Sequence, residues 1–184
     1  MSWLSDYRAD VARYTEYTEH PGARDVLVQQ GLWALLQYRL ASAIYRSSLP
    51  PALRLPLLAV FYAWRKTIEV STGICLPHTA VIGPGLYIAH YGQIIFNKHT
   101  EMGATCDVHQ GVTIGASDRG GRAGVPRIGE RVWIGPNATL AGPITVGDYV
   151  MISANSLVVR DVPSNAVVRG VPAEVVGTRP PRTS

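Results

Sequence analysis

The chain has 184 residues, of which 47% are apolar and only 16% are charged, and its formal net charge is +4. This composition excludes an intrinsically disordered chain, which would be poor in apolar residues and rich in charge. The basic residues form no cluster and the two cysteines are too few for a disulfide framework, so we expect a cytoplasmic protein with no nucleic-acid partner.

Residues 1–72 are predicted to form a short N-terminal helical segment. Apolar residues recur at helical spacing in three stretches, separated by breaks rich in proline, glycine and serine: 4–14, 26–45 and 53–68. The longest apolar run, 55–64, is too short to cross a bilayer, and the first residues lack the features of a signal peptide. We therefore expect no transmembrane segment, and we expect the helices to pack against the rest of the chain or another subunit.

Residues 73–165 are predicted to form a repeat domain. Nine of the eleven intervals between successive aliphatic positions are six residues long: Ile82, Ile88, Ile94, Met102, Val108, Ile114, Ile128, Ile134, Leu140, Val146, Ile152 and Val158. Hexapeptide periodicity is the signature of a β-helix, in which three six-residue sides close one coil. The twelve aliphatic positions predict four coils, whereas the strands of an ordinary β-sandwich rarely keep such regular intervals.

Aliphatic positions three repeats apart are expected on the same side of the β-helix. One such set is Ile88, Val108, Ile134 and Ile152, and two residues beyond its members stand His90, Gln110, Pro136 and Ala154. A strand spacing of about 4.8 Å predicts that the latter four residues stack in one column, with His90 about 14 Å from Ala154.

The repeat resembles the hexapeptide-repeat acyltransferases and, within them, the serine acetyltransferase family, over roughly residues 30–177. The resemblance is carried by IGPGL at 82–86, His90, QGVTIG at 110–115, VWIG at 132–135 and GVPA at 170–173. It implies a left-handed parallel β-helix behind an N-terminal helical segment. It also implies a homotrimer or a pair of trimers, with acetyl-CoA as cosubstrate in clefts between adjacent β-helices.

The resemblance places the catalytic histidine at His90 and coenzyme contacts at or near Ala116, Ser117, Pro136 and Ala154. The predicted column agrees with this site, because an extended pantetheine arm spans the distance along the axis. Acetyl transfer from a thioester to a hydroxyl needs a base near neutrality, for which imidazole is suited. We therefore expect His90 to be the general base of a direct transfer that needs no metal, the alternative being a corner histidine without chemistry.

Three further residues are candidates for binding the acceptor: Asn97, His109 and Gln110. His109 follows Val108 where a small residue usually stands, so it lines the cleft beside His90, contacts a neighbouring subunit or is a simple surface side chain. Asn97 adjoins the eight-residue interval, and Gln110 stands in the column below His90.

Residues 116–127 exceed the repeat and are predicted to protrude as a loop, which covers the active site in the resembling family. Its arginines, Arg119, Arg122 and Arg127, are candidates to bind coenzyme phosphates through charge-assisted hydrogen bonds. The alternative for each arginine is a solvated surface charge. Residues 166–184 are expected to form a C-terminal tail.

The sequence departs from the serine acetyltransferases at positions that contact their acceptor. Ala89 replaces an Asp that contacts the amino acid, and Gly124 and Val125 replace an Arg-His pair that binds it. Cys75 occupies the position of an Asp that orients the histidine, so a backbone carbonyl, His109 or Asp107 would have to do this. Because a zwitterion binds poorly without charged partners, we expect a small-molecule or carbohydrate hydroxyl as acceptor. The alternative is serine O-acetylation in cysteine biosynthesis.

Two other classes remain open from the sequence alone. A zinc-dependent lyase of the γ-carbonic-anhydrase type would need His90, His99 and His109 to converge on a metal at a subunit interface. A scaffold that has lost its chemistry would retain the β-helix but bind no coenzyme. The protruding loop and the closing GVPA motif favour acyl transfer over the lyase.

Overall fold

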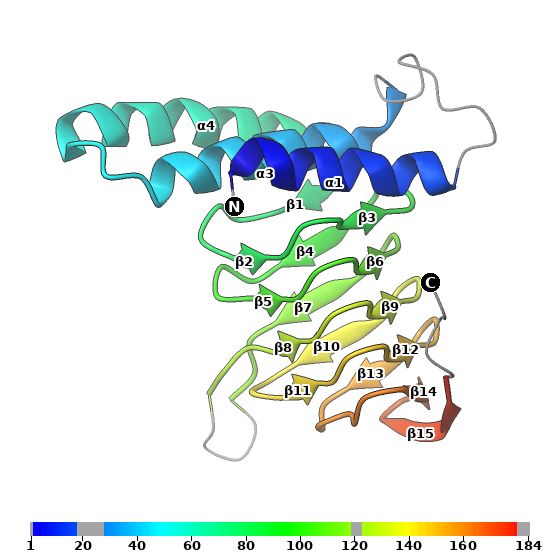
Figure 1. The fold of residues 1–184 in the computed structure, drawn as a ribbon. Helices are drawn as coiled ribbons and strands as arrows, with labels where there is room; N and C mark the ends of the chain where they lie inside the picture. The colour runs from blue at the N-terminus through cyan, green and yellow to red at the C-terminus, as the bar shows by residue number, and fades with distance from the viewer. Residues whose placement is uncertain (1, 18–27, 119–122, 180–184) are drawn as a thin grey trace.

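The computed structural model describes residues 2–17, 28–118 and 123–179. Within these ranges, three helices lie across one end of a stack of β-coils (Figure 1): α1 (Trp3–Glu16), α3 (Gln30–Tyr45) and α4 (Pro51–Thr72). Local sequence explains where α4 begins and ends. Pro51 suits the first helical turn, where no amide donor is needed, and Gly73 takes a left-handed φ of 73° beyond the last turn. The helix is therefore longer than the apolar pattern over 53–68 predicts.

The repeat domain is a triangular β-helix built from three sheets. Sheet A contains β1 (Ile74–Cys75), β4 (Ile94–Phe96), β7 (Thr113–Gly115), β10 (Thr139–Ala141) and β13 (Leu157–Val158). Sheet B contains β2 (Val81–Ile82), β5 (Glu101–Met102), β8 (Arg127–Ile128) and β11 (Thr145–Val146). Sheet C contains β3 (Tyr87–Ile88), β6 (Asp107–Val108), β9 (Trp133–Ile134), β12 (Met151–Ile152), β14 (Ala166–Gly170) and β15 (Ala173–Thr178). Each strand pairs in parallel with the strand one coil away, except that β14 and β15 are antiparallel.

The repeated aliphatic side chains fill the interior of the prism, and those of Ile88, Val108 and Ile134 are at most 2% exposed. Small residues let successive coils approach at the corners. At Gly83, a Cβ atom would lie 2.6 Å from the backbone nitrogen of Ala104, so the repeat requires glycine there.

The β-helix extends beyond the twelve predicted positions at both ends. Ile74 in β1 precedes the series, and Val168 in β14 pairs with Ile152. The expected C-terminal tail contains the antiparallel hairpin β14–β15, while residues 180–184 lie outside the described part of the chain. The hairpin was not predicted because the six-residue interval is lost after Val158.

Side chains from the helices satisfy the backbone at the open end of the β-helix. The Tyr14 hydroxyl donates to the Ile88 carbonyl at 3.0 Å and accepts from the Ile88 amide at 3.2 Å. The Tyr38 hydroxyl does the same for β2, donating to the Ala80 carbonyl at 2.9 Å and accepting from the Ile82 amide at 3.0 Å. The strands that would otherwise present an unpaired edge are thus covered.

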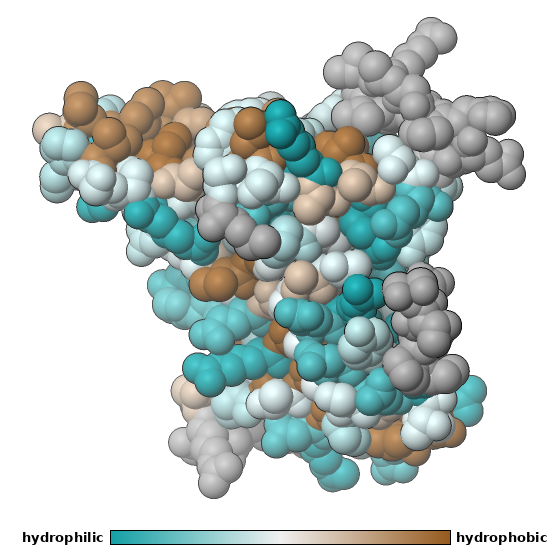
Figure 2. All heavy atoms as spheres, viewed as in Figure 1, coloured by the Kyte–Doolittle hydropathy of each residue, from teal (hydrophilic) through white to brown (hydrophobic). Residues whose placement is uncertain are grey.

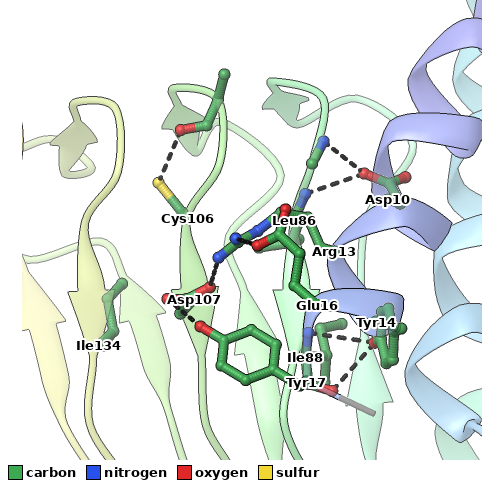
Figure 3. A network of polar contacts seen from close by, with 12 residues as sticks. Asp10, Arg13, Tyr14, Glu16, Tyr17, Leu86, Ile88, Cys106, Asp107 and Ile134 are labelled. Atoms are coloured by element: carbon green, nitrogen blue, oxygen red, sulfur yellow. Dashed lines mark hydrogen bonds and ion pairs between the residues drawn. The ribbon is translucent and has the colours of Figure 1, made fainter. Parts of the chain in front are cut away.

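A buried ion pair joins α1 and α3 to the same coil. Arg39 donates from Nε and Nη2 to Asp10 at 2.8 and 2.9 Å, and it also donates to the Ile82 and Gly83 carbonyls at 2.7 Å. Asp10 accepts in turn from the amides of Gly85 and Leu86 (Figure 3). Because both charges are also hydrogen-bonded to backbone, the pair fixes how the helices sit on the first coil.

The projecting part of α4 leaves large apolar side chains exposed. Leu53, Leu55 and Val60 are 58%, 63% and 66% exposed, and Figure 2 shows hydrophobic residues gathered over this projection. None of the helices in the described ranges is long and apolar enough to cross a membrane.

Candidate active site

The predicted column lies at one corner of the prism. Ile88 is in register with Val108, Val108 with Ile134, and Ile134 with Ile152, so these four residues follow one another down sheet C. The turns that lead from sheet C to sheet A, which we call the C–A corner, therefore bring together the residues two positions beyond: His90, Gln110, Pro136 and Ala154.

His90 stands exposed at the head of this corner, two residues beyond the end of β3. Its turn is held on both sides, because the Ala89 amide donates to the Val108 carbonyl at 3.0 Å and the Gly92 amide donates to the Thr72 carbonyl at 2.8 Å. Within the described ranges, no side chain hydrogen-bonds to the His90 ring. The imidazole is thus presented on a fixed backbone and is accessible to a reacting hydroxyl.

Asp107 does not orient His90. It lies on the outer side of β6, where its Oδ1 accepts from Arg13 at 2.5 Å and its Oδ2 accepts from the Tyr17 hydroxyl at 3.2 Å (Figure 3). Both carboxylate oxygens are therefore engaged with α1 and the residue that follows it. The sequence offered no local signal for this long-range partnership.

His109 and Gln110 differ in how they are held. Nδ1 of His109 lies 3.0 Å from the Ile134 carbonyl and donates to it when it carries the proton, and in that neutral tautomer Nε2 is an acceptor. Its ring also packs against Trp133. Oε1 of Gln110 is buried and has no hydrogen-bond partner among the described residues. Gln110 is thus an unsatisfied acceptor one coil below His90.

The remaining candidates occupy a different corner, where sheet A leads to sheet B, which we call the A–B corner. Asn97 closes a turn there, its Oδ1 accepting from the His99 amide at 3.0 Å. Ala116 and Ser117 follow β7, and paired backbone hydrogen bonds between Ser117 and Gly124 close the base of the protruding loop. Arg119 and Arg122 fall outside the described residues.

A cavity of about 470 Å³ opens at the A–B corner, and its lining includes Glu101, Gly124, Val125 and Arg127. Nε of Arg127 lies 3.3 Å from a Glu101 carboxylate oxygen, and both side chains are largely exposed. The predicted site residues thus form two groups at two corners, with sheet A between them. Within a single chain, His90 therefore does not lie next to this cavity.

The described residues contain no group of three or more His, Cys, Asp and Glu side chains that could hold a metal ion. His90 and His109 follow strands of sheet C, whereas His99 belongs to the A–B corner. Within one chain, the three histidines of the zinc-lyase alternative therefore do not converge.

Comparison with known proteins identifies the family. Residues 126–160 match the model of the bacterial transferase hexapeptide (six repeats). The chain is 34% identical over 162 residues to a serine acetyltransferase of Helicobacter pylori, covering 86% of this chain and 90% of that protein. It is 38% identical over 113 residues to a serine acetyltransferase of Mycobacterium tuberculosis, but spans only about half (49%) of that longer protein.

Solved structures that resemble this chain are serine acetyltransferases as well. The serine acetyltransferase of Neisseria gonorrhoeae superposes with a TM-score of 0.80 at 26% identity, covering 96% of this chain and 66% of that one. A serine acetyltransferase in complex with CoA gives the same TM-score and identity, covering 95% of this chain and 69% of that chain. This likeness confirms the predicted left-handed parallel β-helix behind an N-terminal helical segment. The predicted enzyme class, an acetyl-CoA-dependent acyltransferase, is also the class of these relatives, and the chain belongs to the serine acetyltransferase family of hexapeptide-repeat acyltransferases.

Proposed function

We propose that this chain is an acetyl-CoA-dependent O-acetyltransferase in which His90 is the general base and L-serine is the acceptor. The observation that carries the proposal is the exposed imidazole of His90 at the head of a column that continues through Pro136 and Ala154. The relatives, named as serine acetyltransferases, favour serine over the carbohydrate hydroxyl expected from the sequence.

The chemistry needs one base and a well-placed thioester. His90 removes the hydroxyl proton as the oxygen attacks the thioester carbonyl, and a tetrahedral oxyanion forms. When the intermediate collapses, the carbon–sulfur bond breaks and the imidazolium returns its proton to the departing CoA sulfur. The acetyl group passes directly to the acceptor, without a covalent enzyme intermediate.

The separation of the two corners supports a homotrimer. In the proposed arrangement, the C–A corner of one copy faces the A–B corner of the next, so that His90 meets the cavity beside Arg127. Coenzyme would lie in the cleft between the copies, against Ala116, Ser117, Pro136 and Ala154. The exposed apolar side of α4 supports pairing of two such trimers, and two unpaired thiols support a cytoplasmic location.

A charged pair in the cavity wall supports serine as the acceptor. The residues of serine acetyltransferases expected to hold the amino acid are absent at Ala89, Gly124 and Val125. The same cavity, however, contains Arg127 and Glu101, which lie opposite each other on β8 and β5. A guanidinium and a carboxylate 3.3 Å apart match the carboxylate and ammonium groups of a zwitterion.

The second candidate acceptor is a carbohydrate hydroxyl. It is favoured by Gly124 and Val125, which add no charge to the cavity wall. On this alternative, Arg127 and Glu101 would only neutralise each other on the surface.

The test measures release of CoA thiol from acetyl-CoA with L-serine, free sugars, nucleotide sugars and oligosaccharides as acceptors. The proposal expects turnover with serine, a loss of about 10²–10⁴-fold in kcat for His90→Ala, and a raised KM for serine in Arg127→Gln. Arg160→Gln, an exposed arginine at the same corner, is the matched control. Turnover with a sugar alone would replace serine by the carbohydrate acceptor, and full activity of His90→Ala would remove the base assignment.

A further inference from the structure

The third corner of the prism, where sheet B leads to sheet C, carries a cluster of arginines far in sequence from one another. Thr105, Arg131 and Tyr149 occupy this B–C corner in three successive coils, linked by backbone hydrogen bonds of 2.9 Å from coil to coil. All three take a left-handed φ between 55° and 59°, which turns the chain sharply. Arg13 approaches from α1, and Arg179 approaches from the residue after β15.

These side chains line a small cavity of about 40 Å³. Its walls are formed by Arg13, Arg131, Arg179, Thr105, Asp107 and Tyr149. One water needs about 10–15 Å³, so the cavity has room for a group of a few heavy atoms. Its size suits a single oxyanion group.

The charges around the cavity do not balance. Three guanidinium groups face one carboxylate, and both oxygens of that carboxylate, Asp107, are already bound by Arg13 and Tyr17 (Figure 3). Glu16 pairs with Arg13 at the outer edge, but its side chain is 57% exposed. The cavity therefore carries an excess of positive charge.

Two arginine nitrogens at the cavity are buried without a partner. Nε of Arg13 and Nη1 of Arg179 have no hydrogen-bond acceptor among the described residues. Buried donors are almost always satisfied, and an unsatisfied one costs about 1–3 kcal/mol. The guanidinium carbon of Arg131 lies 5.6 Å from the centroid of the Tyr149 ring, a cation–π contact that orients this third cation.

We propose that the B–C corner is a binding site for a phosphate group. Arginines from three directions suit a tetrahedral oxyanion, which offers acceptors on every side, better than a planar carboxylate, which is bound along one edge. The site is distinct from the active site, because His90 belongs to the C–A corner and the serine cavity to the A–B corner. In the proposed site, Arg13 of α1 and Arg179 after β15 both contact the phosphate. A bound phosphate would therefore link segments that lie more than 160 residues apart in the sequence.

The experiment titrates inorganic phosphate into the full chain by calorimetry, with sodium chloride holding the ionic strength constant. The test variants are Arg179→Gln and Arg131→Gln, and glutamine at 131 is tolerated by the backbone because Gln93 takes a similar φ at another corner. Arg169→Gln, an exposed residue of β14, removes the same charge away from the cavity and is the matched control. Circular dichroism establishes that each variant is folded.

We expect saturable binding of about one phosphate per chain, weakened by about tenfold or more in each test variant and changed less than about twofold in the control. Absence of saturable binding up to about 10 mM phosphate would overturn the proposal, as would equal binding by all variants. Equally tight binding of acetate would overturn the choice of phosphate. Displacement of phosphate by CoA would show that the site belongs to the coenzyme and is not a separate one.

Discussion

Replacing Tyr14 by Phe tests whether α1 positions β3, the strand that leads into the turn with His90. The change removes one hydroxyl and leaves both the amide and the carbonyl of Ile88 without their partner. Tyr14 is only 5% exposed and Ile88 2% exposed, so water does not readily take its place. Each buried group left without a partner costs about 1–3 kcal/mol. Part of this cost is offset because the buried phenol oxygen is itself removed. We therefore expect the free energy of unfolding to fall by about 2–4 kcal/mol.

The assay is urea unfolding at a fixed protomer concentration, combined with thermal melting, where this loss corresponds to a fall of about 5–15 °C for a chain of this size. Tyr38→Phe is the matched control, because Tyr38 makes the same two bonds to β2, which carries no predicted site residue. Both variants should lose similar stability, while only Tyr14→Phe should also lower kcat. A change in stability below about 0.5 kcal/mol for Tyr14→Phe would refute the reasoning, and equal activity of the two folded variants would refute the link to His90.

Two further predictions concern groups with shifted pKa values. Burial and the nearby guanidinium groups of Arg65 and Arg46 lower the pKa of His78, so the unfolded chain binds a proton that the folded chain resists. Stability should therefore fall as the pH drops through about 6.5, less steeply in His78→Gln, and identical pH profiles from urea unfolding would contradict this. Burial raises the pKa of the Cys106 thiol to about 12, and burial also raises that of the half-buried Cys75. A thiol reagent at pH 8 should modify Cys75 slowly and Cys106 only after unfolding, and rapid labelling of Cys106 in the native protein would contradict its burial.

The sequence was sufficient to predict the β-helix and one of its corners. The six-residue interval is a local property, so it predicted that Ile88, Val108, Ile134 and Ile152 align, and the register confirms this. The interval is lost before β14, so the closing hairpin could not be read from it.

The hexapeptide pattern could not predict contacts between residues that lie far apart in the sequence. Asp107 occupies an ordinary outward position of the repeat, and nothing near it in the sequence indicates Arg13 and Tyr17 as its partners. The two-corner arrangement of the site was also missed, because counting along one column does not place Asn97 or Arg127 relative to His90. Those relations depend on where the sheets meet and, in the proposed trimer, on how its copies face one another.

The register of sheet C limits the lengths at which this protein can gain or lose residues. One coil without a protruding loop takes 18 residues, the separation of Ile134 and Ile152. Duplication of one such unit would lengthen the prism by about 4.8 Å and return every later residue to its own sheet. An insertion of six residues would instead move every later strand onto the next of the three sheets. Ala154 would then no longer lie at the corner that contains His90. Viable length variants of the β-helix should therefore differ in steps of a whole coil, with loops at the corners absorbing any other number.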